Sequence, residues 1–212
     1  ALTAPADVAA SVRMDAAGSM LALNTPIGHA HVALAVPGLH MARNALAAAA
    51  AAIAAGASIV AVKRGLAAFR PVAGRLVASR TGAGAEVIDD TYNANPDSMR
   101  AAIDVLAAAA GTRVLAMGDM GEVGAQGTAY HREIGAYARE RGIHRLYALG
   151  AMSAEAVAAF GAGAAYFDDA DALAAALVPV ATTGVTVLVK GSRFMRMERI
   201  VAALTGAGGG AH

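Results

Sequence analysis

Acid, amide and hydroxyl side chains are concentrated in one short stretch of the chain, residues 86–99, with the sequence EVIDDTYNANPDSM. Its apolar beginning predicts a strand. Its end predicts a helix, because Asn95 is a favourable N-cap and Pro96 suits the first helical turn. Two carboxylates and two amides therefore lie between a strand and a helix. In an open α/β sheet that place is the crevice where ligands bind, so we expect these side chains to hydrogen-bond a ligand.

A second group, Lys190-Gly-Ser-Arg193, has the donors of an anion site. Gly191 lets the backbone approach a ligand, and the helix that follows presents free N–H groups. The side chains of Lys190, Ser192 and Arg193 add further donors. We expect a carboxylate or a phosphate there, with a solvated basic turn as the alternative. The group is not a P-loop, because that motif requires Gly directly before the Lys, where this chain has Val189.

Other polar positions carry weaker signals. Residues 118–122 and 150–153 also follow predicted strands, but Gly, Asp and Ser are common in ordinary turns as well. His131 is an isolated histidine on a predicted helix, where a structural role competes with a functional one. The histidines of residues 29–40 lack the spacing of a metal-binding motif, and we predict no metal site in this chain.

The elements that must position these groups alternate between strands and helices. Short apolar runs that end at polar residues predict strands, and the Ala- and Leu-rich stretches between them predict helices. This alternation forms right-handed βαβ units, and hence an α/β, Rossmann-like, mainly parallel sheet with helices on both faces. The polar groups should then meet along its carboxyl edge. The predicted strands are residues 114–117, 146–149, 165–167 and 185–189, and the predicted helices are residues 130–140, 154–160, 170–180 and 196–204.

The N-terminal part of the chain has a different pattern. Residues 1–36 contain short apolar runs separated by Gly and Pro-Gly turns, which predicts antiparallel strands. Two helices are predicted next, the second with Ser58 as its N-cap. At the other end of the chain, the last residues are rich in Gly, which is typical of a disordered terminus. The predicted helices are residues 44–55 and 59–67, the predicted domains are residues 1–76 and 77–206, and the predicted disordered tail is residues 207–212.

The composition and the charge argue against several classes of protein. Among 212 residues, 17 are Lys or Arg and 16 are Asp or Glu, for a formal net charge of +1. No segment clusters basic with aromatic residues, so we expect no nucleic-acid partner. The chain has no Cys, which fits a reducing compartment. The most apolar run, residues 45–55, is too short for a membrane span. We therefore expect a cytoplasmic protein without membrane insertion. Separately, we expect it to be a monomer.

In combination and in this order, the motifs resemble those of the Mur ligases, and within that family the branch that adds a dipeptide. One departure is Met41, where the family commonly has Asn directly after the motif His, and we assign that side chain no role. The matching features are Pro37-Gly-Leu-His40 with Asn44, Gly74-Arg75, Asp89-Asp-Thr-Tyr-Asn-Ala-Asn95 with Ser98-Met99, Gly118-Asp-Met-Gly-Glu-Val-Gly124 with His131, and Val189-Lys-Gly-Ser-Arg193.

The resemblance implies a three-domain enzyme of peptidoglycan precursor synthesis that uses ATP and Mg²⁺. ATP would activate the carboxyl group of a UDP-N-acetylmuramoyl tripeptide as an acyl phosphate, which the amine of D-alanyl-D-alanine would attack. This chain would hold the α/β end of the central ATPase domain, residues 1–76, and the C-terminal domain. The P-loop and the metal ligands would lie upstream, so the chain by itself is expected to be inactive.

The resemblance also implies roles for single residues. Asn44 would contact the adenine. Arg75, on the phosphates, and Asp90, on the ribose hydroxyls, would be the catalytic residues, because a guanidinium can stabilise phosphoryl charge and a carboxylate can accept from two hydroxyls. They would lie on opposite sides of the domain boundary, so that bound nucleotide would promote domain closure. The residues that would face the dipeptide or the reacting centre are Tyr92, Asn93, Asn95, Lys190, Ser192 and Arg193.

Two other interpretations remain open. The chain could be a non-catalytic module that binds a small anion at the Lys190 edge. It could also belong to a related ligase with another amino-acid acceptor, such as glutamate. A P-loop encoded upstream would favour a ligase, and the motif forms around Asp90 and Lys190 favour the dipeptide-adding branch by resemblance.

Overall fold

The computed structural model describes residues 6–14, 18–70 and 72–206. The chain divides into two compact units, unit 1 (Ala1–Pro71) and unit 2 (Val72–His212). The sequence placed the boundary later, after Leu76. The residues before that point are bonded to unit 2: the Tyr92 N–H donates to the Gly74 carbonyl (2.9 Å) and the Leu76 N–H to an Asp90 carboxylate oxygen (3.3 Å). The predicted disordered tail, residues 207–212, lies outside the described residues.

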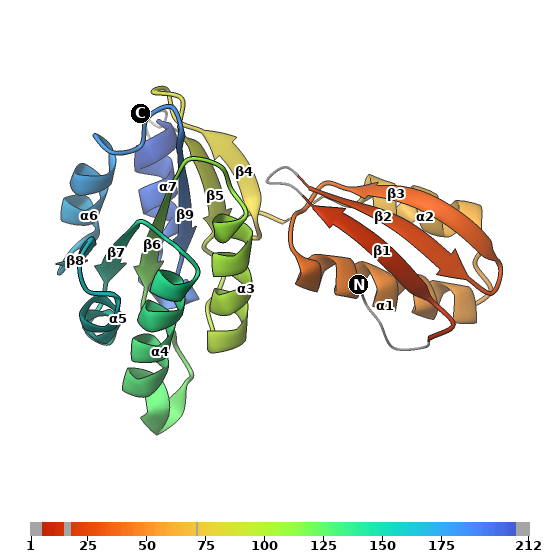
Figure 1. The fold of residues 1–212 in the computed structure, drawn as a ribbon, viewed down its shortest axis with the longest axis horizontal. Helices are drawn as coiled ribbons and strands as arrows, with labels where there is room; N and C mark the ends of the chain where they lie inside the picture. The colour runs from red at the N-terminus through yellow and green to blue at the C-terminus, as the bar shows by residue number, and fades with distance from the viewer. Residues whose placement is uncertain (1–5, 15–17, 71, 207–212) are drawn as a thin grey trace. The chain divides into compact units, whose positions relative to one another are not determined.

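Unit 1 is a three-stranded antiparallel sheet with two helices on one face (Figure 1). Alternate residues of the central strand, such as Leu21 and Leu23, are buried against the helices. The Ser58 cap is confirmed, since its hydroxyl accepts from the Ala61 N–H. The first helix begins earlier than predicted, directly after Gly38 (φ 102°). The elements are β1 (Ala9–Met14), β2 (Ser19–Thr25), β3 (Gly28–Leu34), α1 (Leu39–Ala54) and α2 (Ile59–Ala68).

Unit 2 contains a six-stranded sheet with the order β4-β5-β9-β6-β7-β8. All its named strand pairs are parallel except β4 with β5, which confirms the predicted mainly parallel α/β sheet. The short edge strand β4 was not predicted. The last strand of the chain, β9, lies between β5 and β6. The strands are β4 (Val77–Arg80), β5 (Glu86–Asp90), β6 (Thr112–Gly118), β7 (Arg145–Leu149), β8 (Ala164–Phe167) and β9 (Val185–Lys190).

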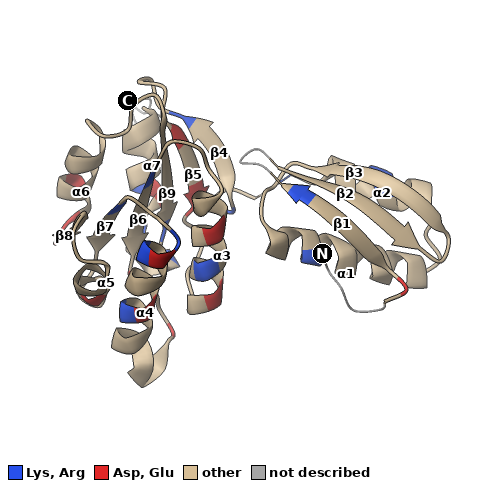
Figure 2. Cartoon of the chain, in the orientation of Figure 1, with Lys and Arg blue, Asp and Glu red and all other residues tan. Residues whose placement is uncertain are grey.

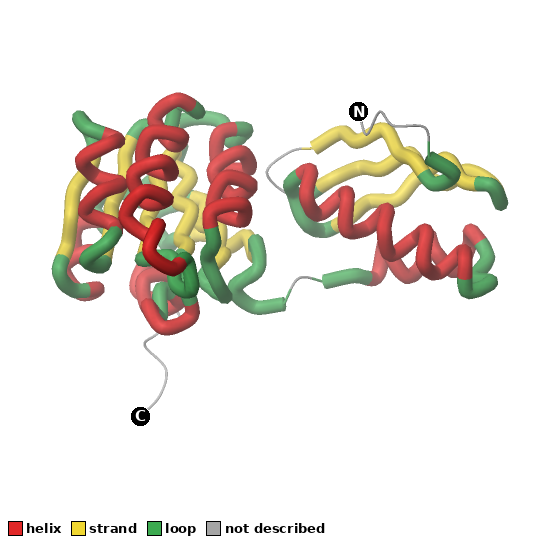
Figure 3. Tube along the Cα trace, turned by 90° about the horizontal axis from the view of Figure 1, so that it is seen from below, coloured by secondary structure: helices red, strands yellow, loops and turns green. Residues whose placement is uncertain are grey.

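Helices cover both faces of this sheet (Figure 3). Val87, Val187 and Val189 point to the face that α6 and α7 cover. Their neighbours in sequence, such as Ile88 and Leu188, point to the opposite face, where α3 contacts β6 and β9. Both faces are therefore buried, as a parallel sheet requires. The helices are α3 (Pro96–Ala107), α4 (Gly127–Glu140), α5 (Ser153–Phe160), α6 (Ala170–Leu177) and α7 (Glu198–Thr205), with short 3₁₀ turns at η1 (Gly124–Gln126) and η2 (Arg193–Met195).

Charged residues of both signs are interspersed along unit 2, and α3 and α4 each carry acidic and basic residues (Figure 2). Arg100 of α3 forms ion pairs with Asp97 (2.7 Å) and with Glu133 of α4 (2.5 Å). The hydrogen bond to Glu133 raises the pKa of Arg100 above its usual value. Within the described residues, no helix is long and apolar enough to cross a membrane.

Helices α4 and α5 pack closely because α4 carries a glycine at the contact. A Cβ atom on Gly135 would lie 2.1 Å from the carbonyl oxygen of Ala156 in α5. Real side chains do not approach a backbone oxygen so closely, so Gly135 sets the separation of the two helices.

The substitution Gly135→Ala should destabilise unit 2 by about 1–3 kcal/mol, although Ala is the better helix former, because the added methyl group meets the backbone of α5. The matched control is Gly65→Ala in α2, where nothing lies within 4 Å of the added atom. That change should stabilise unit 1 by up to about 1 kcal/mol. Hydrogen exchange of the amides of α4 and α2, recorded at increasing urea concentrations, measures the unfolding free energy of each unit separately. An unfolding free energy of unit 2 that is unchanged or raised in Gly135→Ala would contradict the close packing.

Candidate functional site

The register of β5 and β9 brings Asp90 and Lys190 side by side. The two strands are parallel neighbours and pair Asp90 directly with Lys190. The Lys190 ammonium lies 2.6 Å from the Asp90 Oδ2 and donates to the backbone carbonyl of Asn93 at 2.8 Å. Lys190 is only 3% exposed, and such a buried cation needs partners of this kind. The sequence predicted a carboxylate or a phosphate at Lys190, facing the dipeptide or the reacting centre. In the structure its ammonium binds the Asp90 carboxylate and the backbone carbonyl of Asn93.

Ser192 is also buried and connects three loops of the carboxyl edge. Its hydroxyl accepts from the Gly121 N–H (2.5 Å) and donates to the Ala94 carbonyl (3.1 Å). Its own N–H donates to the carbonyl of Asp119 (3.0 Å). These bonds join the ends of β9, β6 and β5. Ser192 therefore links the loops after β5 and β6 to the end of β9.

Residues 118–122 and 150–153, which follow β6 and β7, meet at Asp119. Its Oδ1 accepts from the Ser153 N–H (2.8 Å) and from the Ser153 hydroxyl (2.7 Å), at the start of α5. This negative charge is favourable at a helix N-terminus. These contacts are those of a structural turn. The sequence left open whether the two segments are ordinary turns, and the Asp119 to Ser153 bonds favour that interpretation.

His131 is fully buried and has a partner on each ring nitrogen. Nδ1 lies 2.7 Å from the Gly127 carbonyl, and Nε2 accepts from the Met120 N–H at 2.9 Å. Because Nε2 accepts, the proton is on Nδ1, which donates to Gly127. His131 thus ties the turn after β6 to α4.

Three other predicted residues lie on the exposed side of the edge. Asn95 caps α3 as predicted, accepting from the Ser98 N–H (2.8 Å), and its own N–H donates to the Ser98 hydroxyl (3.0 Å). Asn93 is exposed, and its side-chain oxygen accepts from the Ala94 N–H (2.9 Å). The side chain of Arg193 is 70% exposed and lies 3.7 Å from Glu198. Arg193 is therefore a cation that can meet an anion from solvent.

Arg75 and Tyr92 form an exposed pair. The guanidinium carbon of Arg75 lies 4.2 Å from the centre of the Tyr92 ring, within the range of a cation–π contact. Both residues belong to unit 2, as does Asp90. The sequence predicted Arg75 and Asp90 on opposite sides of a boundary after Leu76, whereas this division puts both in unit 2. Arg75 lies in residues 72–76, which we call the linker. The linker is hydrogen-bonded to the loop after β5 through the Gly74 carbonyl and the Tyr92 N–H.

Asn44 lies in unit 1, on the exposed side of α1. It borders an apolar pocket of about 300 Å³ within this unit, and its amide nitrogen lies 4.0 Å from the sulfur of Met41. Met41, to which the sequence assigned no role, lines the same pocket. Apolar walls with one amide at the margin suit a planar heteroaromatic ring. The lining residues are Leu34, Val36, Met41, Asn44, Ala45, Ala48, Leu66 and Phe69.

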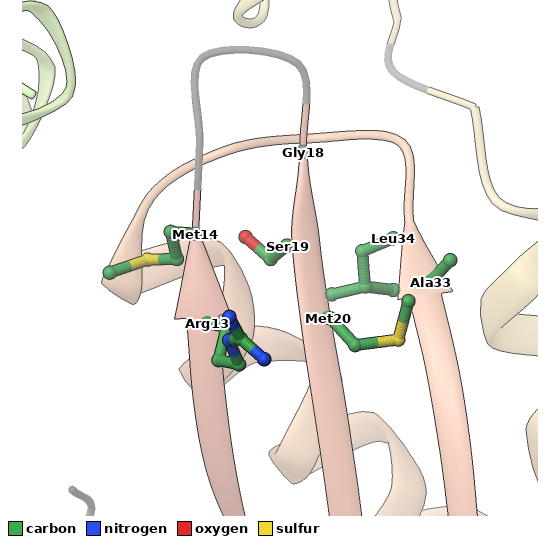
Figure 4. Close-up of a pocket in the computed structure, with 7 residues that line it drawn as sticks. All are labelled: Arg13, Met14, Gly18, Ser19, Met20, Ala33 and Leu34. Carbon is green, nitrogen blue, oxygen red and sulfur yellow. The ribbon is translucent and has the colours of Figure 1, made fainter. Parts of the chain in front are cut away.

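A larger hollow of about 630 Å³ lies at one end of β1, β2 and β3, in unit 1 (Figure 4). Arg13 is its charged residue, and the hydroxyl of Ser19 donates to the Val36 carbonyl. Among the described residues that line this hollow, we find no converging polar groups. Across the described parts of both units, no three His, Cys, Asp or Glu side chains form a group able to hold a metal ion.

Sequence reasoning missed Phe194 at the carboxyl edge of unit 2. This side chain is 63% exposed, and a Cβ on Gly121 would lie 2.8 Å from its ring. Gly121 thus leaves room for the ring beside the turn after β6. The available signal was the position of Phe194 directly after Lys190-Gly-Ser-Arg193, in a chain with only 4 Phe.

The substitution Lys190→Met should lower the free energy of unfolding of unit 2 by about 3 kcal/mol, because it leaves the part-buried Asp90 carboxylate without its ammonium. The matched control is Arg193→Met, which removes an exposed cation and should change stability by less than about 0.5 kcal/mol. Urea unfolding of both variants, followed by circular dichroism, measures the difference. Equal stabilities would show that the Lys190 to Asp90 pair does not support the fold.

The comparisons with known proteins agree with these motifs. Residues 74–193 match the family model described as "Mur ligase, glutamate ligase domain". A curated relative, the UDP-N-acetylmuramoyl-tripeptide--D-alanyl-D-alanine ligase of Escherichia coli (strain K12), is 40% identical over 197 residues, which cover 92% of this chain and 44% of the relative. The chain thus spans less than half the length of this relative.

Solved structures show the same relationship. The crystal structure I of MurF from Acinetobacter baumannii has a TM-score of 0.86 and 33% identity, covering 93% of this chain and 44% of that one. The MurF ligase from Thermotoga maritima in complex with ADP has a TM-score of 0.81 at 21% identity, covering 93% of this chain and 46% of that one, and so shows a shared fold. Because the family model covers more than half of the sequence and the relative in Escherichia coli covers nearly all of it, the chain belongs to the Mur ligase family.

Proposed function

We propose that this chain is the C-terminal part of an ATP-dependent ligase that adds D-alanyl-D-alanine to a UDP-N-acetylmuramoyl tripeptide. The observation that carries the proposal is the carboxyl edge of unit 2. There, the buried motif residues Lys190 and Ser192 fix the loops of the edge. Arg75, Asn93 and Arg193 are exposed on these loops, and we call this exposed part the rim. The 40% identity to a relative with that name supports the choice of substrates.

The reaction proceeds in two steps. The γ-phosphoryl group of ATP passes to the tripeptide carboxylate, which gives ADP and an acyl phosphate. The amine of the dipeptide then attacks the acyl carbon, forms the amide and releases inorganic phosphate and a proton. Both steps place negative charge on phosphoryl oxygens. A fixed guanidinium can stabilise that charge, and this is the role that we assign to Arg75.

Asn44 and Asp90 are the residues that we assign to the nucleoside part of ATP. Asn44 and the apolar pocket beside it receive the adenine, because a planar ring fits apolar walls and an amide can pair with a base edge. Asp90 accepts from the ribose hydroxyls in addition to its bonds with Lys190 and the Leu76 N–H. Mg²⁺ accompanies ATP and neutralises phosphate charge when bound. Its protein ligands are expected in the upstream part of the full-length enzyme.

The dipeptide binds at the rim of unit 2, with its carboxylate on Arg193. This side chain is exposed, whereas Lys190 and Ser192 are buried and act by holding the loops around it. The amide of Asn93 adds donors from the neighbouring loop. Asn95 supports the same loop as the cap of α3.

The whole enzyme is proposed to act in the cytoplasm as a monomer on small-molecule substrates. The 212-residue chain alone should not turn over, because its sequence contains no P-loop. A related ligase with another amino-acid acceptor is the main alternative, and the choice of acceptor distinguishes the two.

Full-length protein that contains this chain should release phosphate from ATP with Mg²⁺ and the UDP-linked tripeptide only when D-alanyl-D-alanine is present. Phosphate release is measured with the dipeptide, without it, and with D-glutamate or single D-alanine in its place. Release that requires one of the other acceptors would assign the chain to another branch of the family. No release with any acceptor would contradict the ligase function.

In the full-length enzyme, Arg193→Met should raise the KM for the dipeptide about tenfold or more, because a charge-assisted hydrogen bond to the carboxylate is lost. The KM for ATP should stay within about twofold. Arg199→Met in α7, which also removes an exposed arginine, serves as the control and should change neither constant. Steady-state phosphate release with each substrate varied provides both values. A normal dipeptide KM in Arg193→Met would place the carboxylate elsewhere.

A further inference from the structure

We propose that Tyr92 is a positioning residue for Arg75, with its ring as the platform that holds the guanidinium ready for nucleotide phosphates. This inference rests on the proposed function, in which Arg75 contacts the phosphates. It differs from the expectation drawn from the sequence, where Tyr92 faces the dipeptide or the reacting centre. The part of the side chain that acts is the face of the ring, and the hydroxyl is not needed.

The contact between Tyr92 and the linker is made at several points. The Arg75 guanidinium carbon lies 4.2 Å from the ring centre. The Tyr92 N–H donates to the carbonyl of Gly74 at 2.9 Å. The backbones are so close that a Cβ on Gly74 would lie 2.9 Å from the Tyr92 nitrogen. Gly74 also has a positive φ of 75°, which favours glycine. The linker therefore lies directly on the loop that carries the ring.

The backbone is also held on the other side of Arg75. Leu76 has a positive φ of 54°, an uncommon conformation for a residue with a branched side chain. Its N–H donates to Asp90 at 3.3 Å, and Asp90 is paired with the buried Lys190. Bonds at Gly74 and Leu76 thus flank Arg75, and the aromatic ring lies against its side chain.

A stacked guanidinium keeps its donors for another partner. Cation–π attraction uses the face of the guanidinium plane, whereas its N–H groups lie in the plane and point outward. Among the residues that the structure describes, none forms an ion pair with Arg75. A free arginine has many rotamers, and ordering them opposes binding. A platform that already orders the side chain lowers this cost, so phosphates should bind more tightly.

Two substitutions of Tyr92 separate the ring from the hydroxyl. Tyr92→Phe keeps the aromatic face, and Tyr92→Leu removes it while keeping an apolar side chain. Tyr92 is 45% exposed, so neither change should disturb the core. Thermal unfolding of each full-length variant checks this point. Arg75→Gln removes the guanidinium, and Arg80→Gln on β4 removes another exposed arginine as a control.

The experiment measures the dissociation constants of a non-hydrolysable ATP analogue and of adenosine by calorimetry, with full-length protein and Mg²⁺. Tyr92→Leu should weaken binding of the analogue about three- to fivefold, the size of an exposed cation–π contact. Tyr92→Phe and Arg80→Gln should retain the wild-type affinity. Adenosine has no phosphates, and its affinity should be the same in all variants. The double variant Arg75→Gln/Tyr92→Leu should bind no more weakly than Arg75→Gln alone.

Several results would overturn the inference while the proposed function stands. These are an unchanged affinity in Tyr92→Leu, an equal loss in Tyr92→Phe, additive losses in the double variant, or a loss that extends to adenosine. A wild-type protein that does not bind the ATP analogue would instead overturn the proposed function, and the inference with it.

Discussion

The carboxyl edge of unit 2 depends on one buried ion pair. Lys190 ends the strand that lies between β5 and β6, where its ammonium is nearly inaccessible to water. A cation in that place needs a negative partner, because desolvation of an unpaired charge costs several kcal/mol. Asp90 on the adjacent strand provides it at 2.6 Å, and the Asn93 carbonyl takes a second donor. The pair thereby fixes the end of β5 and the loop that follows it.

The other polar residues of the edge divide into those that hold it and those that face solvent. Ser192, Asp119 and His131 direct their hydrogen bonds to neighbouring turns, so the strand ends form one connected network. Arg75 and Arg193 remain exposed above this network. A site that positions phosphates and a carboxylate needs such support, because small displacements of the charged groups weaken their effect. Several motif residues of a binding site can thus be buried and still serve it.

The sequence predicted most elements well where the signal is local. Caps at Ser58 and Asn95 were recognised because the N-cap preference acts within one helical turn. The sequence missed β4, which has only four residues and pairs with a strand that follows a turn. The start of α1 was placed too late, because Gly38 resembles a loop residue. The structure divides the chain after Pro71 and the sequence predicted a division after Leu76. The two differ because the local sequence pattern does not reveal that Gly74 bonds Tyr92 and Leu76 bonds Asp90.

By itself, the sequence determined that unit 2 has a mainly parallel α/β sheet and that its polar groups follow the strands, because hydrophobic periodicity and turn residues are local properties. Only the tertiary structure decided which strands are neighbours. Asp90 and Lys190 are 100 residues apart, and they meet because β9 enters the sheet beside β5. The motif around Lys190 has the donors of an anion site, and one of its cations is bound by a carboxylate of the same chain. That outcome depends on strand order and burial, which are set by the packing of the whole unit.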